Sequence, residues 1–142
     1  MKAKPRRFAE GTSVDVTKSR MEVEQLLAKH GAAQVLIGSD SVTRQGFVGF
    51  TLEGRQYRML VPARDTTKGH EQQVDRERWR ALVLILKAKL EVVASEMVTA
   101  EQEFLAYMVL PNGKTVGAEI APMLTAAYDG GSMPNLLPEW RG

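Results

Sequence analysis

The sequence contains no cysteine and only two histidines among its 142 residues. Without cysteine the chain forms no disulfide bond, thiolate metal site or cysteine nucleophile, which fits the reducing cytoplasm, where we expect the protein. His30 falls near an expected helix end and His70 in an expected loop, so they form no metal-binding pattern. Our first interpretation is therefore a non-enzymatic protein with no metal, no cofactor and no catalytic residue.

Aromatic residues are also scarce, at 6%, and the formal net charge is only +2. So small a total charge cannot by itself hold nucleic acid, and such binding would need a local basic patch. The longest apolar run, residues 81–86, is too short to cross a membrane, and no apolar segment follows the basic N-terminus as in a secretory signal. We expect no membrane association.

The rest of the composition, 44% hydrophobic and 25% charged, is typical of one globular domain with a sizeable core. Residues 1–7 hold four basic residues, with nothing to pack before Phe8. We interpret residues 1–7 as a flexible basic arm and residues 8–142 as a single α+β domain. The arm either lies along phosphates or is a solvated start without a role.

Residues 76–94 predict a long central helix around which the domain is built. An apolar stripe repeats at steps of three and four: Trp79, Leu82, Val83, Leu86, Leu90 and Val93. A second apolar group falls on another side: Ala81, Ile85, Ala88 and Val92. We expect the stripe to pack on a sheet and the second side to be covered by the C-terminal helices or by a second copy of the chain.

Upstream, Ser19 and Glu22 have the spacing of a capping box and predict a first helix over residues 20–30. Gly31 follows as its stop signal. Residues 13–16 predict a short edge strand before this helix.

Three further strands are predicted over residues 34–37, 46–52 and 55–61, the last two joined by a two-residue loop at Glu53-Gly54. Alternation gives this hairpin one apolar face, made of Val48, Phe50, Leu52, Tyr57, Met59 and Val61. Its opposite face carries Gly49, Thr51, Gln56 and Arg58.

Residues 62–75 have the composition of a loop. After the central helix, a capping box at Thr99 starts a short helix through Tyr107, and a last helix is predicted over residues 119–128. Three apolar residues of the tail, Leu136, Leu137 and Trp140, are expected to pack on the same domain.

The expected fold is therefore α+β: a small antiparallel sheet of three or four strands packed on a long central helix, with additional C-terminal helices. Double-stranded RNA-binding domains share the core order α-β-β-β-α, but this likeness concerns topology alone.

Basic residues gather at the start of the central helix and on the expected sheet. Arginines at a helix start oppose the helix dipole and need anionic partners, which are either Glu71, Asp75 and Glu77 or phosphates. The candidate nucleic-acid contacts are Arg44, Arg55, Arg58, Arg76, Arg78, Arg80 and Lys87.

A metal-dependent nuclease is the enzyme alternative. Asp40 follows a predicted strand and Glu77 opens the central helix, which is similar to the placement of metal-binding acids in ribonuclease H-like enzymes. The sequence departs from that pattern because no strand with a third aspartate follows. Asp40 is more simply interpreted as a turn former.

Several segments resemble those of small uncharacterised proteins encoded by bacteriophages, prophages and other bacterial mobile elements. They lie at residues 10–14, 18–20, 79–90, 103–106 and 109–113, and the likeness spans roughly residues 8–138. Similar chains carry a longer charged insertion before the central helix, where this chain is short. The resemblance implies a genomic setting rather than an activity, and no catalytic residue can be carried over from it.

The leading hypothesis is a non-enzymatic accessory protein of phage or mobile-element origin that contacts nucleic acid or a nucleic-acid-processing complex. An alternative is a protein-interaction module that inhibits or modulates a host defence or replication complex, with a host or phage protein as partner. A homodimer is a further expectation, because the central helix has two apolar sides.

Overall fold

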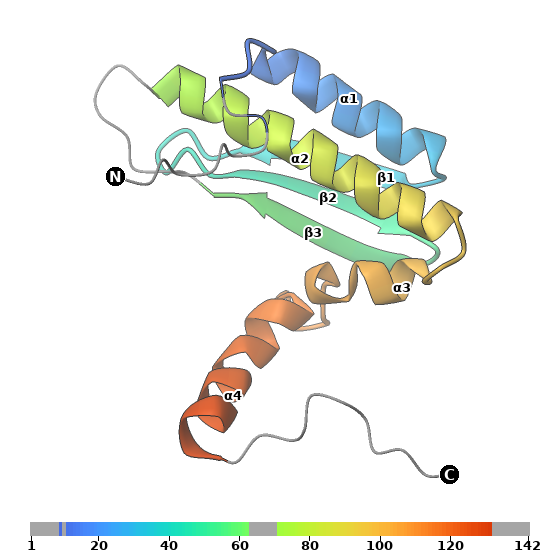
Figure 1. Ribbon diagram of the computed structural model, residues 1–142, viewed down its shortest axis with the longest axis vertical. Helices are drawn as coiled ribbons and strands as arrows, with labels where there is room; N and C mark the ends of the chain where they lie inside the picture. The colour runs from blue at the N-terminus through green and yellow to red at the C-terminus, as the bar shows by residue number, and fades with distance from the viewer. Residues whose placement is uncertain (1–8, 10, 63–70, 132–142) are drawn as a thin grey trace, which may run out of the picture.

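A three-stranded sheet and a long helix organise the computed structural model, which describes residues 9, 11–62 and 71–131 (Figure 1). In chain order its elements are α1 (Val16–Lys29), β1 (Ala33–Ser39), β2 (Gly46–Leu52), β3 (Arg55–Val61), α2 (Glu71–Ala94), α3 (Ala100–Glu103), the 3₁₀ helix η1 (Leu105–Tyr107) and α4 (Val116–Gly130). The strands pair antiparallel in the order β1-β2-β3. The expected α+β fold is confirmed.

Helices α1 and α2 lie side by side over one face of the sheet, and the core fills the space between these layers (Figure 1). All six apolar residues of the β2–β3 face are buried, as predicted. They meet Val23 and Leu27 of α1 and most of the predicted stripe of α2, including Leu86 at 0% exposure. Burial first, and then the carboxylates of Glu101 and Glu53, raise the pKa of the Tyr57 phenol.

The β2–β3 hairpin has the predicted strand limits and the predicted two-residue loop. Glu53 and Gly54 have φ angles of 50° and 79°, and Leu52 pairs with Arg55 across the turn. Positive φ at both loop residues is what a type I′ turn requires, and its twist matches that of the flanking strands. A local sequence signal therefore fixes the register of this pair.

The start of α1 differs from the prediction. The helix begins at Val16 rather than Arg20, and residues 13–16 form no strand. Ser19 is not an N-cap but an interior helical residue at 0% exposure. The apolar stripe of Val23 and Leu27 continues upstream through Val16, and Ser19 lies on this inward side. The spacing between Ser19 and Glu22 is that of a capping box, but Ser19 does not cap this helix.

Helix α2 begins at Glu71, so residues 71–75 of the predicted loop are helical, while residues 63–70 lie outside the described part of the chain. Contacts distant in sequence hold this first turn. Asp75 Oδ1 accepts a hydrogen bond from Arg44 Nη2 at 2.8 Å, and Gln73 Nε2 donates to the Thr12 carbonyl oxygen at 2.9 Å. No short-range pattern encodes these contacts.

The predicted capping box at Thr99 is confirmed. The Thr99 hydroxyl accepts from the Gln102 backbone N–H at 3.1 Å, and the Gln102 side chain accepts from the Thr99 N–H at 2.9 Å. Phe104, which follows α3, is fully buried with its ring edge-on to Phe50. The α3–η1 segment therefore extends the core beside α2 on the same side of the sheet.

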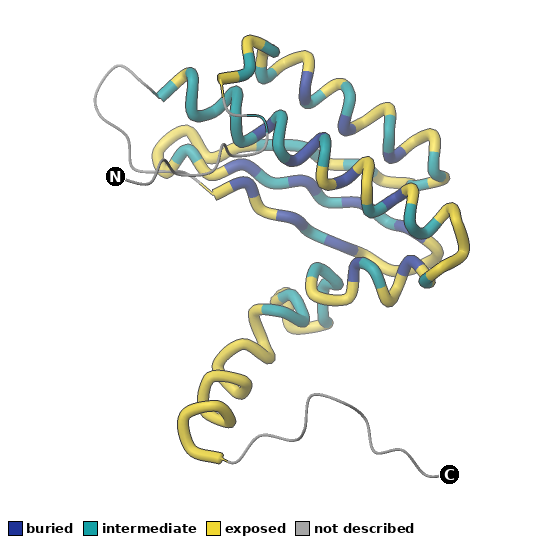
Figure 2. Tube along the Cα trace, viewed as in Figure 1, coloured by how far each residue is buried: buried dark blue, intermediate teal, exposed yellow. Residues whose placement is uncertain are grey.

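Helix α4 is longer than predicted, because Thr115 caps it by accepting from the Ala118 N–H at 3.2 Å. It points away from the sheet and has no buried residue (Figures 1 and 2). The expectation that the C-terminal helices cover the second apolar side of α2 is wrong for α4, and Ile85 on that side is 43% exposed. The N-terminal arm (1–7) and the expected packing of Leu136, Leu137 and Trp140 lie outside the described residues.

Candidate nucleic-acid interface

A groove of about 600 Å³ runs between α1 and α2, and all of its described lining residues belong to these two helices. Its lining residues are Lys18, Met21, Glu22, Gln25, Leu26, Lys29, Arg80, Val83, Leu84 and Lys87. The groove forms because the inward stripes of both helices are committed to the core, while their outer flanks carry long side chains that diverge toward solvent.

Positive charge dominates this α1–α2 groove. Among the described residues it contains the cations Lys18, Lys29, Arg80 and Lys87 but a single carboxylate, that of Glu22. Arg80 Nη1 donates to Glu22 Oε2 at 2.7 Å, so these two charges neutralise each other. The three lysines are exposed and have no ion pair within the described ranges, which leaves three uncompensated positive charges along the groove.

Helical spacing places the cations of each helix along one side of that helix. Lys18 and Lys29 are eleven residues apart, which is close to three full turns, so they project from the same side of α1 about 16 Å apart. Arg80 and Lys87 are two turns apart on α2, separated by about 10 Å. Between the cations of the two helices, the floor of the groove is apolar and consists of Met21, Leu26, Val83 and Leu84.

Two of the seven candidate residues from the sequence, Arg80 and Lys87, lie in this groove. Arg44 does not, because its guanidinium is engaged by Asp75 at 2.8 Å and by the Glu71 carbonyl oxygen at 3.0 Å. Arg76 donates to the Gln73 side chain one turn earlier on the same helix. Asp75 was expected to neutralise the arginines at the start of the central helix. It pairs instead with Arg44 of the loop between β1 and β2.

The remaining three candidates are dispersed. Arg58 lies on the uncovered face of the sheet and donates to the Gly113 carbonyl oxygen at 2.8 Å. Arg55 is exposed at the start of β3. Arg78 is two residues from Arg80, so it projects about 200° away around α2. The seven residues thus do not form one continuous patch.

Sequence reasoning missed Lys18 and Lys29. The signal was present, since their spacing matches three helical turns and Lys87 shares a helix side with Arg80. Starting the first helix at Arg20 placed Lys18 outside it, and the correct start at Val16 brings both lysines onto one helix.

Asp40, the acid of the nuclease alternative, forms a turn between β1 and β2. Its Oδ1 accepts from the backbone N–H groups of Val42 at 2.7 Å and Thr43 at 2.9 Å. These bonds, that from Thr43 first, hold the pKa of Asp40 below its ordinary value of 3.8. The interpretation of Asp40 as a turn former is confirmed.

Glu77, the second acid of that alternative, contacts the segment before α1. Its Oε1 accepts from the Gly11 N–H at 3.0 Å and from Gln73 Nε2 at 3.4 Å. Within the described ranges no three residues among His, Asp and Glu come together as a metal site would require. Glu77 thereby links α2 to the chain entering α1.

Comparison with known proteins adds no relative: no protein-family model, curated protein or solved structure matches the chain. In the part of the chain that the structure describes, no helix has the length and apolar character needed to cross a membrane.

Proposed function

We propose that the protein is a non-enzymatic accessory protein, encoded by a phage or another bacterial mobile element, that contacts nucleic acid through the α1–α2 groove. One observation supports the nucleic-acid contact above the others. Within the described part of the chain, Lys18, Lys29 and Lys87 remain uncompensated along the groove, because the one carboxylate that lines it there, Glu22, already pairs with Arg80. The genomic setting follows from the sequence resemblance alone.

The composition of the groove defines the kind of contact. Three lysines act as point charges toward phosphates, and none of the described lining residues has an aromatic ring on which a base could stack. We therefore expect binding that depends little on sequence and falls steeply with salt, with a dissociation constant on the order of 10⁻⁴ to 10⁻⁶ M at physiological salt.

The test compares two variants that each lose three positive charges. The groove variant replaces Lys18, Lys29 and Lys87 with alanine. The control variant replaces Arg55, Arg78 and Lys114, which lie on β3, on another side of α2 and before α4. Binding to fluorescent single-stranded and double-stranded DNA and RNA is measured by anisotropy at low salt, after circular dichroism has shown that both variants are folded.

We expect the groove variant to lose most of the affinity and the control variant to retain most of it. Equal losses in the two variants would mean that only total charge matters, and the groove would then have no special role. No binding by the unmodified protein at low salt would contradict the nucleic-acid proposal altogether.

A second candidate function is a protein-interaction module that modulates a host defence or replication complex. It is favoured by the second apolar side of α2, where Ile85 is 43% exposed and Ala88 is exposed. A pull-down with Ile85→Glu beside the unmodified protein tests it, and a partner captured equally by both would not use this side of α2.

A further inference from the structure

The face of the sheet opposite α1 and α2 carries exposed apolar side chains among polar ones and is uncovered by any described element. Leu36 of β1 and Leu60 of β3 are 63% and 52% exposed on it. Gly49 of β2, which pairs with Leu36 on one side and Arg58 on the other, has no side chain, and the nearest atom to a Cβ at this position would be 3.8 Å away. The result is a groove of about 490 Å³ across the middle of the sheet, with Phe47 at one side.

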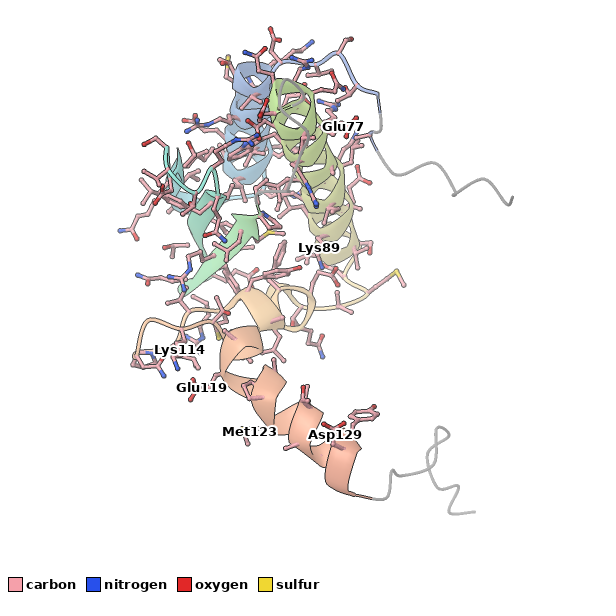
Figure 3. The ribbon with its side chains drawn as sticks, turned by 90° about the vertical axis from the view of Figure 1, so that its left-hand side faces the viewer. Glu77, Lys89, Lys114, Glu119, Met123 and Asp129 are labelled. Atoms are coloured by element: carbon pink, nitrogen blue, oxygen red, sulfur yellow. The ribbon has the colours of Figure 1, made fainter. Side chains whose placement is uncertain are left out.

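Helix α4 offers an exposed apolar surface, and the helix is about as long as a strand of the sheet. Its exposed apolar residues Ile120, Met123, Leu124 and Tyr128 are separated by three, one and four residues, so they form one stripe. Met123 is 67% exposed and projects from the helix into solvent (Figure 3). The 15-residue helix is about 22 Å long, and a seven-residue strand is about 23 Å long.

The charges of the two surfaces are also complementary. The only charged residues of α4 are Glu119 and Asp129, so the helix has no cation. Of the described residues that line the groove across the sheet, Arg58 alone is charged, and none is a carboxylate. An acidic apolar helix thus faces no like charge on this surface.

The α4 helix is held at its start in a direction that leads away from its own sheet (Figure 1). The Val116 N–H donates to the Met108 carbonyl oxygen at 2.9 Å, and Arg58 fixes the preceding turn through the Gly113 carbonyl. Gly117 packs so closely on η1 that a Cβ there would lie 3.0 Å from the Ala106 carbonyl oxygen. Folding α4 back onto its own sheet would break these contacts.

We propose that the uncovered face of the sheet receives helix α4 of a second copy of this chain. Reciprocal docking of both α4 helices makes a closed dimer with two-fold symmetry. The sheet face and the α1–α2 groove lie on opposite sides of the domain, so this proposal does not depend on the proposed nucleic-acid contact.

The absence of cysteine makes disulfide crosslinking a direct test, because every thiol is an introduced one. Full-length chains carrying Leu124→Cys on α4 are mixed with chains carrying Leu60→Cys on the sheet and gently oxidised. The proposal expects a crosslinked pair in this mixture and none when the sheet variant is replaced by Ile85→Cys on α2. Equal crosslinking of both mixtures would overturn the docking site.

Sedimentation across the micromolar range supplies the second measurement. The unmodified chain is expected to dimerise, and Leu124→Glu is expected to raise the dimer dissociation constant about tenfold or more, because it places a charge against an apolar surface. Leu124 is exposed, so the variant keeps the fold. A sedimentation result that shows a monomer at every concentration overturns the proposal. So does a chain carrying both Leu60→Cys and Leu124→Cys if its disulfide forms only within one chain.

Discussion

Arg80 Nη1 on α2 and Glu22 Oε2 on α1 lie 2.7 Å apart and form an ion pair within the α1–α2 groove. Their side chains are 23% and 30% exposed, so the pair is only partly screened by solvent. The pair joins the two helices above the core and neutralises the one carboxylate found among the described residues of the groove. Glu22 therefore sets how positive this surface is.

Replacing Glu22 with glutamine is expected to strengthen binding of nucleic acid, because it frees the positive charge of Arg80 at nearly constant side-chain size. Glu24→Gln is the matched control, since Glu24 is exposed on the same helix but does not line the groove. Anisotropy titration at low salt measures both variants. Equal effects of the two substitutions would show that position in the groove does not matter.

Replacing Ser19 with alanine is expected to stabilise the protein. The Ser19 hydroxyl is fully buried and has no hydrogen-bond partner in the described structure. Alanine lacks this unpaired hydroxyl and has a higher helix propensity than serine. Together these two effects are expected to add about 1 kcal/mol to the free energy of unfolding. Urea unfolding measures it, and a loss of about 1 kcal/mol would instead support the N-cap role that the sequence suggested.

A methyl group at Gly46 is expected to destabilise the fold. A Cβ there would lie 2.6 Å from Cζ2 of the buried Trp79 ring and 3.3 Å from Val61 Cβ. Overpacking of this kind costs about 1–3 kcal/mol. Gly49→Ala is the control in the same strand, because its nearest neighbour atom is 3.8 Å away. Similar thermal stability of the two variants would mean that Trp79 moves freely.

The β1–β2 turn is expected to loosen in acid. The folded-state pKa of Asp40 is lowered, so its carboxylate contributes stability above the unfolded pKa of about 3.9 and loses it as the pH falls through the folded value. Amide hydrogen exchange of Val42 and Thr43 reports this directly. We expect protection that is constant at neutral pH and decreases at acid pH, and Asp40→Ala should lack that protection at every pH.

Where structure follows from adjacent residues, the sequence predicted it well. The limits of β2 and β3, their buried face and the capping box at Thr99 all depend on alternation, turn chemistry or a four-residue spacing. The stripe of α2 that meets the sheet was likewise readable from its period.

Elsewhere the outcome depends on contacts between distant parts of the chain. The first turn of α2 is held by Arg44 and Thr12, and no local pattern records either contact. The apolar stripe of α4 predicts a helix but not where it packs, and here it lies away from its own core. The groove was only partly predicted because its lysines come from two helices whose side-by-side packing a sequence does not display.

The salt dependence of nucleic-acid binding tests the central claim most directly. Three lysines that each neutralise a phosphate predict a slope of log K against log salt of about −2 to −3 for the unmodified protein. In the variant lacking Lys18, Lys29 and Lys87 the slope is expected to approach zero, while the Arg55, Arg78 and Lys114 variant keeps it. An unchanged slope in the first variant would contradict a phosphate site between α1 and α2.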